Sequence, residues 1–341
     1  MSRVTRTRSV SLRWEPRVAA VCAALAAAAC GAAVFVVGTG DFPIPALDVL
    51  RVLVGQGDQA TEFIVTTLRL PRAVVGLLAG LALGISGAIF QSVSRNPLGS
   101  PDLIGFTTGS ATGALLQILV FGGGAVAIAT SSVAGAVVTA LLVYLVAYKG
   151  GGVHGLRLVL IGVGAAAMLE AANAYLITRA ELRDAYEAAF WLTGSLNGRG
   201  WEQAVPLAVA MAVLVPLALL CGRQLGMGEL GDEAARALGV PVQRSRALVV
   251  VAGVGLVAAA TAAVGPVPFV ALAAPQLARR LTRRTGPHLL SAGLMGAALL
   301  VVSDLVSLRL PVAVPVGVVT GVLGGLYLVW LLSSRGRKGM P

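Results

Sequence analysis

Residues 73–90 read AVVGLLAGLALGISGAIF and contain no Asp, Glu, Lys or Arg. An uncharged apolar run of about 18 residues or more is long enough to cross the hydrocarbon core of a bilayer as a helix. Further runs without these charged residues occupy 18–38, 103–121, 125–147, 204–222 and 247–264. The chain of 341 residues is 57% hydrophobic and 12% charged, with a mean hydropathy of +0.87. A soluble protein cannot cover so much apolar surface, so the sequence predicts an all-α integral membrane protein.

Four weaker segments complete a predicted set of about ten membrane-spanning helices. The expected spans are 18–38, 70–93, 103–121, 124–147, 156–178, 203–222, 247–264, 266–281, 288–308 and 312–332. The span at 266–281 is short and contains three prolines, but the charge distribution supports its crossing. With ten crossings and a cytoplasmic N-terminus, 19 of the 26 Lys and Arg residues lie on the cytoplasmic side and 7 lie outside, as the positive-inside rule requires. Both termini are therefore expected in the cytoplasm.

The expected organisation is a single polytopic transmembrane domain at 18–332, with basic cytoplasmic tails at 1–17 and 333–341. The arginines of the first tail precede an apolar run, an arrangement that also resembles a signal peptide. The run to Gly38 is long for a signal peptide, and the stretch before Cys30 is a poor lipoprotein-type cleavage site. We therefore prefer an uncleaved first span.

Glycine recurs along one edge of the second span, at Gly76, Gly80 and Gly84, with Gly87 following. Residues four apart lie on the same side of a helix. This edge is therefore smooth and permits the close approach of another helix. We interpret it as tight packing within the bundle rather than as a dimerisation motif.

The remaining composition argues against several classes of function. A net charge of +11 would suit a nucleic-acid-binding protein, but the basic residues are scattered in short loops rather than gathered on one domain. The only lysines, Lys149 and Lys338, are each followed by Gly, so the chain lacks the P-loop signature that binds nucleotide phosphates. His154 and His288 lie far apart in predicted loops, and the three cysteines have no metal-ligand spacing. The sequence therefore predicts no enzyme active site, metal or cofactor in this chain.

Three motifs around the second span are more specific than its composition. Arg69-Leu-Pro-Arg72 opens the span, Gln91-Ser-Val-Ser-Arg-Asn-Pro-Leu98 closes it, and Pro101-Asp-Leu-Ile-Gly105 follows. Together they resemble the FecCD-type permease family, which imports ferric siderophores, haem and vitamin B12. The resemblance extends to about residue 332 through GDEAARALG at 231–239, GPVPFVALAAPQLAR at 265–279 and PVGVVT at 315–320.

This resemblance implies the permease subunit of an ABC importer in the cytoplasmic membrane. The implied partners are a second permease subunit, identical or homologous, two cytoplasmic ATPase subunits that bind ATP and Mg, an extracytoplasmic binding protein, and membrane lipid. A ferric siderophore is the commonest cargo in the family, while haem and cobalamin remain open. The chain departs from the family pattern at Gln276, Ala313 and Leu326, where His, Glu and Pro are usual.

The alternative function is that of an ion-coupled secondary transporter. In that mechanism Glu170 and Asp304, which lie within predicted spans, would carry protons. Transport that needs ATP and survives the collapse of ion gradients would decide in favour of the ABC permease.

The loop at 223–246 contains the signal of a short helix. Asp232 is a candidate N-cap, Gly239 follows the predicted end, and Pro241 lies beyond it. Ala234 and Leu238 lie four residues apart and share an apolar face. The resemblance implies that this is the coupling helix, which enters a groove on the ATPase. The predicted coupling residues are Gly231, Asp232, Glu233, Ala234, Ala235, Arg236, Leu238 and Gly239.

Three arginines on the outer side run against the charge bias of the loops. Arg69 and Arg72 match the family motif whose arginines pair with glutamates of the binding protein. Arg309 follows the ninth span, five residues after Asp304. The resemblance therefore predicts a docking site for the binding protein at these arginines. The alternative is that they anchor helix ends at the headgroups or pair with Asp304.

Glu170 lies near the middle of the fifth span, where an acid that faced lipid would cost roughly 2.5–3.5 kcal/mol on insertion scales. The spacing predicts one shared helix face for Gly162, Ala166, Glu170, Asn173 and Ile177. In the family, the fifth helix lines the translocation path. We therefore predict that Glu170 and Asn173 face this path; a protonated Glu170 that serves only helix packing is the alternative.

Overall fold

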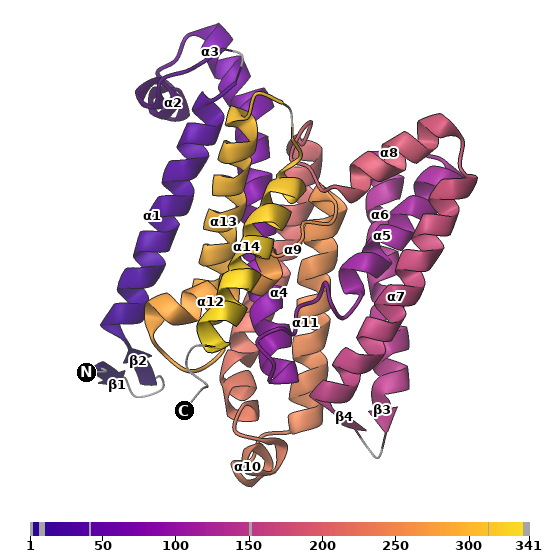
Figure 1. Ribbon diagram of the computed structural model, residues 1–341. Coiled ribbons are helices and arrows are strands. Elements are labelled where there is room, and N and C mark those ends of the chain that lie inside the picture. The colour runs from indigo at the N-terminus through magenta and orange to yellow at the C-terminus, as the bar shows by residue number, and fades with distance from the viewer. Residues whose placement is uncertain (1–2, 7–10, 41, 150–151, 313, 337–341) are drawn as a thin grey trace.

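The computed structural model describes residues 3–6, 11–40, 42–149, 152–312 and 314–336, and it is an upright bundle of helices (Figure 1). The helices of the first half are α1 (Pro16–Gly38), α2 (Ala46–Leu53), α3 (Gln59–Phe63), the π-helix η1 (Ile64–Arg69), α4 (Leu70–Ser94), α5 (Phe106–Leu116), the π-helix η2 (Gln117–Phe121) and α6 (Ala125–Ala147). Those of the second half are α7 (Gly155–Arg179), α8 (Leu182–Leu192), α9 (Trp201–Gly228), α10 (Asp232–Ala237), α11 (Val242–Val264), α12 (Val270–Thr282), α13 (Leu289–Arg309) and α14 (Val316–Gly336). Two antiparallel hairpins pair β1 (Arg3–Arg6) with β2 (Ser11–Trp14) and β3 (Tyr148–Lys149) with β4 (Gly152–Val153).

Each of the ten predicted spans coincides with a helix, although not all of these helices could cross a bilayer by their own length. By length and composition, seven helices of the described residues can do so: α1, the continuous α3–η1–α4 helix, α6, α7, α9, α11 and α13. The apolar helices Phe106–Phe121 and Val316–Trp330 are shorter. Helix α12 has 13 residues, which is only about 20 Å of helix.

Several predicted helix ends differ from the observed ones, those of α9, α11, α12 and α14 by four residues or more. Helices α9 and α11 extend beyond their apolar runs to Gly228 and from Val242, so the connection between them is shorter than the predicted 223–246. Polar residues continue these helices where an apolar signal ends. Helix α12 begins at Val270 rather than at 266. Phe269, just before it, has a left-handed φ of 67°, and Pro266 and Pro268 each disfavour the helical conformation in the residue that precedes them.

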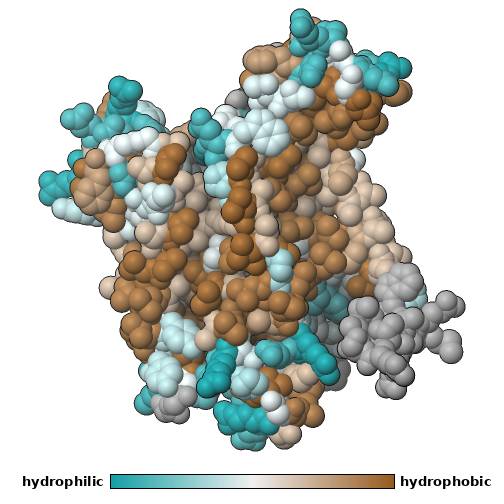
Figure 2. Space-filling view, turned by 180° about the vertical axis from the view of Figure 1, so that it is seen from behind, coloured by the Kyte–Doolittle hydropathy of each residue, from teal (hydrophilic) through white to brown (hydrophobic). Residues whose placement is uncertain are grey.

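The two ends of the bundle carry different small elements. Both chain ends, the β3–β4 hairpin and α10 lie at the lower end in Figure 1, whereas α2, α3 and α8 lie at the upper end. On the face drawn in Figure 2, a broad apolar zone covers the middle, and polar residues gather above and below it. This is the surface expected of a bundle surrounded by lipid.

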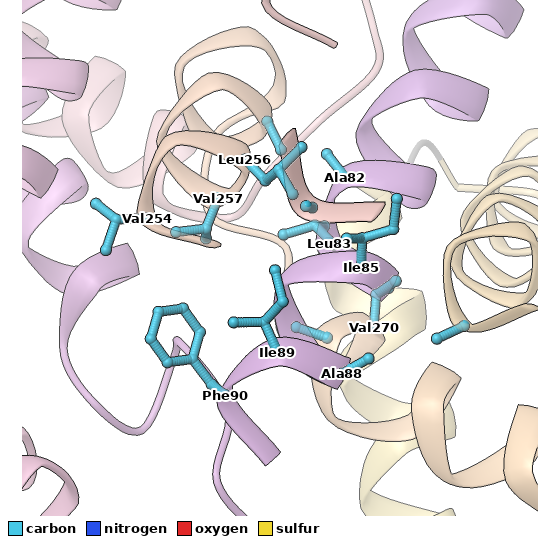
Figure 3. Packing of buried hydrophobic residues seen from close by; sticks show 14 of the residues in the cluster. Ala82, Leu83, Ile85, Ala88, Ile89, Phe90, Val254, Leu256, Val257 and Val270 are labelled. Carbon is cyan, nitrogen blue, oxygen red and sulfur yellow. The ribbon is translucent and has the colours of Figure 1, made fainter. Parts of the chain in front are cut away.

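Helix α4 is the central element of the bundle. Its most apolar window, within Gln59–Ser94, is 78% buried, and it packs against α9, α11, α12 and α13. Figure 3 shows the core where α4 meets α11 and α12, formed by Ala82, Leu83, Ile85, Ala88, Ile89, Phe90, Val254, Leu256, Val257 and Val270.

The glycine edge of α4 is where neighbouring helices approach most closely. A Cβ atom on Gly84 would lie closer than 3.0 Å to the Ala292 carbonyl of α13, and one on Gly87 closer than 3.0 Å to the Ala271 carbonyl of α12. A Cβ on Gly80 would lie 2.5 Å from a carbonyl oxygen of α13. Such backbone approach is possible only without side chains, so the predicted packing within the bundle is confirmed.

Candidate functional site

Helix α10 projects from the lower end of the bundle, between α9 and α11 (Figure 1). Gly239 adopts a left-handed conformation with φ of 81°. Its N–H donates to Arg236 O at 2.9 Å, and the N–H of Val240 donates to Ala235 O at 3.0 Å. These are the two hydrogen bonds of a Schellman C-cap. The predicted short helix and the role of Gly239 at its end are therefore confirmed.

The predicted N-cap is wrong. Gly231 occupies the N-cap position with φ of 113°, and Asp232 is the first helical residue. A positive φ suits glycine because it has no Cβ to clash with the backbone. The carboxylate of Asp232 therefore does not cap α10 and instead forms ion pairs with two arginines.

The apolar residues of the α10 region divide between an inner and an outer set. Ala235 is 0% exposed and packs with Val240 and Val242. In contrast, Leu238 is 62% and Leu230 is 69% exposed. The inner residue holds α10 on the bundle, whereas the two leucines present apolar surface at the tip of the molecule.

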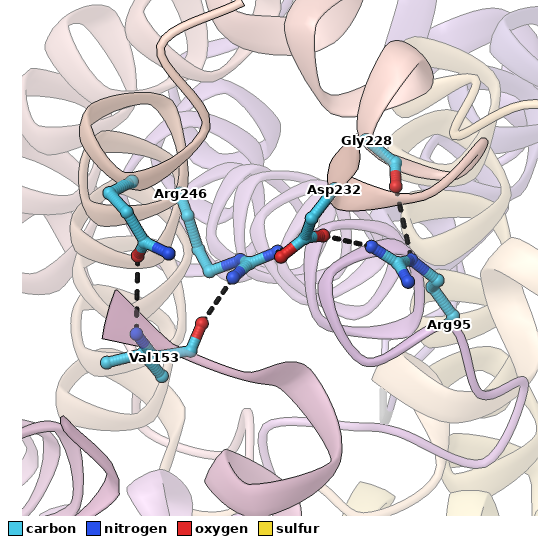
Figure 4. A network of polar contacts seen from close by, with 6 residues as sticks. Arg95, Val153, Gly228, Asp232 and Arg246 are labelled. Atoms are coloured by element: carbon cyan, nitrogen blue, oxygen red, sulfur yellow. Dashed lines mark hydrogen bonds and ion pairs between the residues drawn. The ribbon is translucent and has the colours of Figure 1, made fainter. Parts of the chain in front are cut away.

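Asp232 lies between two arginines from different helices (Figure 4). Arg246 Nη2 on α11 donates to both carboxylate oxygens, at 2.8 and 3.0 Å. Arg95, which follows the end of α4, also forms an ion pair with Asp232 and donates to Gly228 O at 3.1 Å. Burial raises the pKa of the Asp232 carboxyl, but the hydrogen bond and charge of Arg246, with the charge of Arg95, outweigh it and lower the net pKa. Asp232 is therefore a carboxylate at neutral pH.

A polar pocket of about 360 Å³ lies beside this cluster, at the same end of the bundle. Gln91 Nε2 donates to Leu272 O at 2.9 Å, and Gln276 Nε2 donates to Gln91 Oε1 at 3.0 Å and to Pro97 O at 2.8 Å. Gln276, which departs from the family pattern, thus joins α12 to α4 and to the connection that follows α4. Of the other two departures, Leu326 is exposed and Ala313 lies outside the described residues.

The predicted docking arginines occupy different environments at the opposite end. Arg72 donates to both carboxylate oxygens of Asp304, Nε at 3.0 Å and Nη2 at 2.7 Å. Arg69 donates to Val37 O at 3.0 Å and to Phe42 O at 2.8 Å, which holds the turn between α1 and α2 against α4. Arg309 is exposed at the end of α13. The structure brings Arg72 to Asp304 rather than joining the three arginines into one cluster.

The predicted pathway residues lie on α7, whose most apolar window is only 17% buried. Gly162 packs against Ile104, and Ala166 packs against Gly105. Asn173 is buried on the same side, and its Oδ1 has no hydrogen-bond partner among the described residues. Glu170 lies at the edge of this face and is exposed on the outside of the chain. Its carboxylate is therefore available to a second molecule rather than to the core of this one.

Sequence reasoning assigned no role to Arg95 or Arg246. Arg95 stands in a quoted motif, but Asp232 is 137 residues away from it in the sequence. Arg246 is 14 residues from Asp232, beyond the reach of any helix-periodicity rule. The sequence shows an excess of arginine in the predicted cytoplasmic loops, but this excess does not indicate which arginine pairs with Asp232.

The chain is similar to one group of membrane transport proteins along most of its length. A sequence model described as the FecCD transport family matches residues 25–334. The chain is 43% identical over 324 residues to the ferric enterobactin transport system permease protein of Escherichia coli (strain K12), covering 94% of this chain and 98% of that protein. It is 37% identical to an Fe(3+)-citrate import system permease protein of Bacillus subtilis (strain 168), covering 82% of this chain and 85% of that protein. A solved structure described as an inward-facing conformation of a putative metal-chelate type ABC transporter matches with a TM-score of 0.82 and 28% identity, covering 93% of this chain and 99% of that one.

Proposed function

The chain belongs to the FecCD transport family and is a multi-pass permease subunit of an ABC importer in the cytoplasmic membrane, and we propose that its cargo is a ferric siderophore. The observation that carries the cargo is the 43% identity, over 94% of this chain, with the ferric enterobactin permease. A permease whose name specifies cobalamin import is 32% identical over 87% of the chain, so cobalamin is the second candidate. The chain is a transport subunit and not an enzyme.

Uptake into proteoliposomes tests this proposal. The complete transporter, with ATP inside and its binding protein outside, is expected to accumulate a ferric catecholate siderophore. It should accumulate haem or cobalamin at least about tenfold less, because a site that hydrogen-bonds one ligand rejects those that leave its polar groups unpaired. An ionophore that collapses ion gradients is the control and should leave uptake unchanged. Preferred uptake of cobalamin, or uptake without ATP, would contradict the proposal.

We propose ten membrane crossings with both termini in the cytoplasm. The ten predicted spans each coincide with a helix, and both chain ends lie at the end of the bundle that carries α10. Helix α12 is too short to span lipid alone, but it is packed against α4 and α13, so protein rather than lipid surrounds it. The ion-coupled alternative is not supported: the relatives are ABC permeases, and Asp304 is held by Arg72 in a two-bond ion pair.

The family implies an ATPase and a substrate-binding protein as partners. We propose two permease subunits, two ATPase subunits that bind ATP and Mg, and no cofactor in this chain. The exposed Leu230 and Leu238 beside α10 support its docking in an apolar groove of the ATPase. The exposed Arg309 supports docking of an acidic binding protein at the other end, with Arg69 and Arg72 holding the surrounding helices in place.

We propose that Glu170 and Asn173 face the translocation path between two permease subunits. Glu170→Ala is expected to lower transport and substrate-stimulated ATP hydrolysis by about tenfold, which is the effect of losing one hydrogen bond to a charged group. Glu170→Gln should retain part of the activity because it keeps the size and hydrogen-bonding capacity of the side chain. Initial uptake rates in proteoliposomes measure both variants.

Glu181→Ala serves as the matched control for Glu170, because Glu181 is exposed just beyond the end of α7. It should transport at the parental rate. Normal transport in both Glu170 variants would exclude a pathway role. Reduced expression of the Ala variant with full recovery in the Gln variant would favour the packing role.

A further inference from the structure

The carboxylate of Asp232 joins α10 to the end of α4 and to α11. It pairs with Arg95 after α4 and with Arg246 near the start of α11 (Figure 4). Arg246 also donates through Nη1 to the carbonyl of Val153. Val153 is the last residue of β4, which leads directly into α7. A continuous series of charge-assisted hydrogen bonds therefore runs from α10 to Val153, two residues before α7 begins.

These contacts are sheltered from water and have a fixed geometry. The side chains of Arg246 and Asp232 are 8% and 17% exposed. Arg246 uses Nη2 for Asp232 and Nη1 for the Val153 carbonyl, so contacts through two different nitrogens hold its planar guanidinium in orientation as well as in position. Val153 is held a second time, because its N–H donates to Gln243 Oε1 at 3.2 Å. Strand β4 is thus fixed to α11 through both of its backbone polar groups at this residue.

Helix α10 depends on this cluster for its position. A helix of six residues is too short to be stable alone. Apart from Asp232, it is attached mainly through the buried Ala235 against Val240 and Val242. A force on α10 is therefore transferred to α11 and α4 through Asp232 instead of being absorbed by a flexible loop.

We infer that Asp232 and Arg246 form a mechanical link that transmits movement of α10 to the start of α7, the helix that carries Glu170. This inference rests on the proposed docking of α10 on the ATPase. When the ATPase displaces α10, Asp232 moves Arg246, and Arg246 moves Val153 and the first turn of α7 with it. Both residues are positioning residues, because they act on α7 through Val153. Small shifts at one site become larger changes elsewhere because packed interfaces switch between discrete arrangements instead of deforming continuously.

The test follows movement of α7 separately from binding of the ATPase. In a chain with Cys22, Cys30 and Cys221 replaced by Ser, Ala171→Cys places a thiol next to Glu170. Its rate of reaction with a maleimide is measured in the assembled complex with and without ATP. Asp232→Asn and Arg246→Lys are expected to retain the ATPase and its ATP hydrolysis, to abolish the ATP-dependent change in labelling, and to lower transport per ATP by about tenfold, within the usual 5–150-fold range of coupling between sites.

Arg244→Lys is the matched control, since Arg244 is exposed on α11 two residues before Arg246. It should keep the labelling change and transport of the parent. If Asp232→Asn loosens α10 and loses the ATPase, Arg246→Lys decides, because Arg95 still holds Asp232 in that variant. An unchanged ATP-dependent labelling change in Arg246→Lys would overturn the link, and so would loss of the ATPase in both variants, which indicates a purely local structural role.

A separate variant distinguishes failure of the link from failure of the docking on which it rests. Leu238→Asp should lose the co-purifying ATPase, because a charge would have to be desolvated in an apolar groove. Leu47→Asp, an equally exposed leucine on α2 at the other end, should not. Retention of the ATPase and of normal transport in Leu238→Asp would refute the docking of α10.

Discussion

Gly87→Ala is expected to destabilise the protein by about 3 kcal/mol or more. Most of the expressed variant should therefore fail to fold. The added Cβ would lie well inside 3.0 Å of the Ala271 carbonyl oxygen and carbon. These are backbone atoms of α12, which cannot rotate away as a side chain would. The intrinsic helix preference works in the other direction, because Ala favours a helix over Gly by about 1 kcal/mol. A net loss of stability would therefore come from the clash of the new Cβ with α12, which must outweigh this preference. The measurement is the midpoint of thermal unfolding in detergent, together with the yield of monodisperse protein.

Gly31→Ala is the matched control for this prediction. Gly31 lies inside α1, where a Cβ would have no atom within 4 Å. The same substitution should therefore leave the unfolding midpoint unchanged or raise it slightly. Gly84→Ala, against the Ala292 carbonyl of α13, should repeat the effect of Gly87→Ala on a second helix pair. Equal midpoints for Gly31→Ala and Gly87→Ala would contradict the close contact between α4 and α12.

The bilayer makes much of this fold predictable from the sequence. Because every span must be apolar over a fixed length, all ten predicted segments contain a helix. The helix ends in water were predicted less well. Helices α9 and α11 extend past their apolar runs. Helix α4 is preceded without a break by α3 and η1, which contain both polar and apolar residues. Apolarity marks the part of a helix in lipid and carries no information on the part outside it.

In the candidate site, features that depend on neighbouring residues could be predicted, whereas contacts between distant parts of the chain could not. Gly239 could be assigned because a C-cap depends on conformation within a few residues. The partners of Asp232 could not be assigned, because pairing across the bundle depends on how α4, α9 and α11 are arranged. The Arg72–Asp304 pair, separated by 232 residues, was considered only as an alternative to docking. Charge counts showed that arginine was in excess but not which arginines were already paired.

Asp304→Ala is the second substitution with a large expected effect, about 3–5 kcal/mol of lost stability. Asp304 is 1% exposed, and the variant leaves the guanidinium of Arg72 without its carboxylate in a largely buried site. Arg72→Met combined with Asp304→Leu should recover most of this loss, since an apolar pair of similar volume leaves no unpaired charge. The double variant therefore separates the cost of a lone charge from the net contribution of the pair. Unfolding midpoints of the two single variants and the double variant complete the cycle.

Asp48→Ala provides the comparison with an exposed ion pair. Asp48 accepts from Arg51 at 2.8 Å, but the Arg51 and Asp48 side chains are 60% and 43% exposed. Its loss should cost less than about 1 kcal/mol, so the two ion pairs are expected to differ several-fold because the Arg72–Asp304 pair is buried and has a second hydrogen bond.

Asp304→Asn also separates structure from proton transfer at the Arg72–Asp304 pair. A proton carrier would lose all transport on this change, whereas a structural partner of Arg72 should leave transport per folded molecule close to that of the parent. Complete loss of transport in a stable Asp304→Asn protein would restore the ion-coupled mechanism, while lowered stability with preserved transport identifies the pair as a fixed brace between α4 and α13.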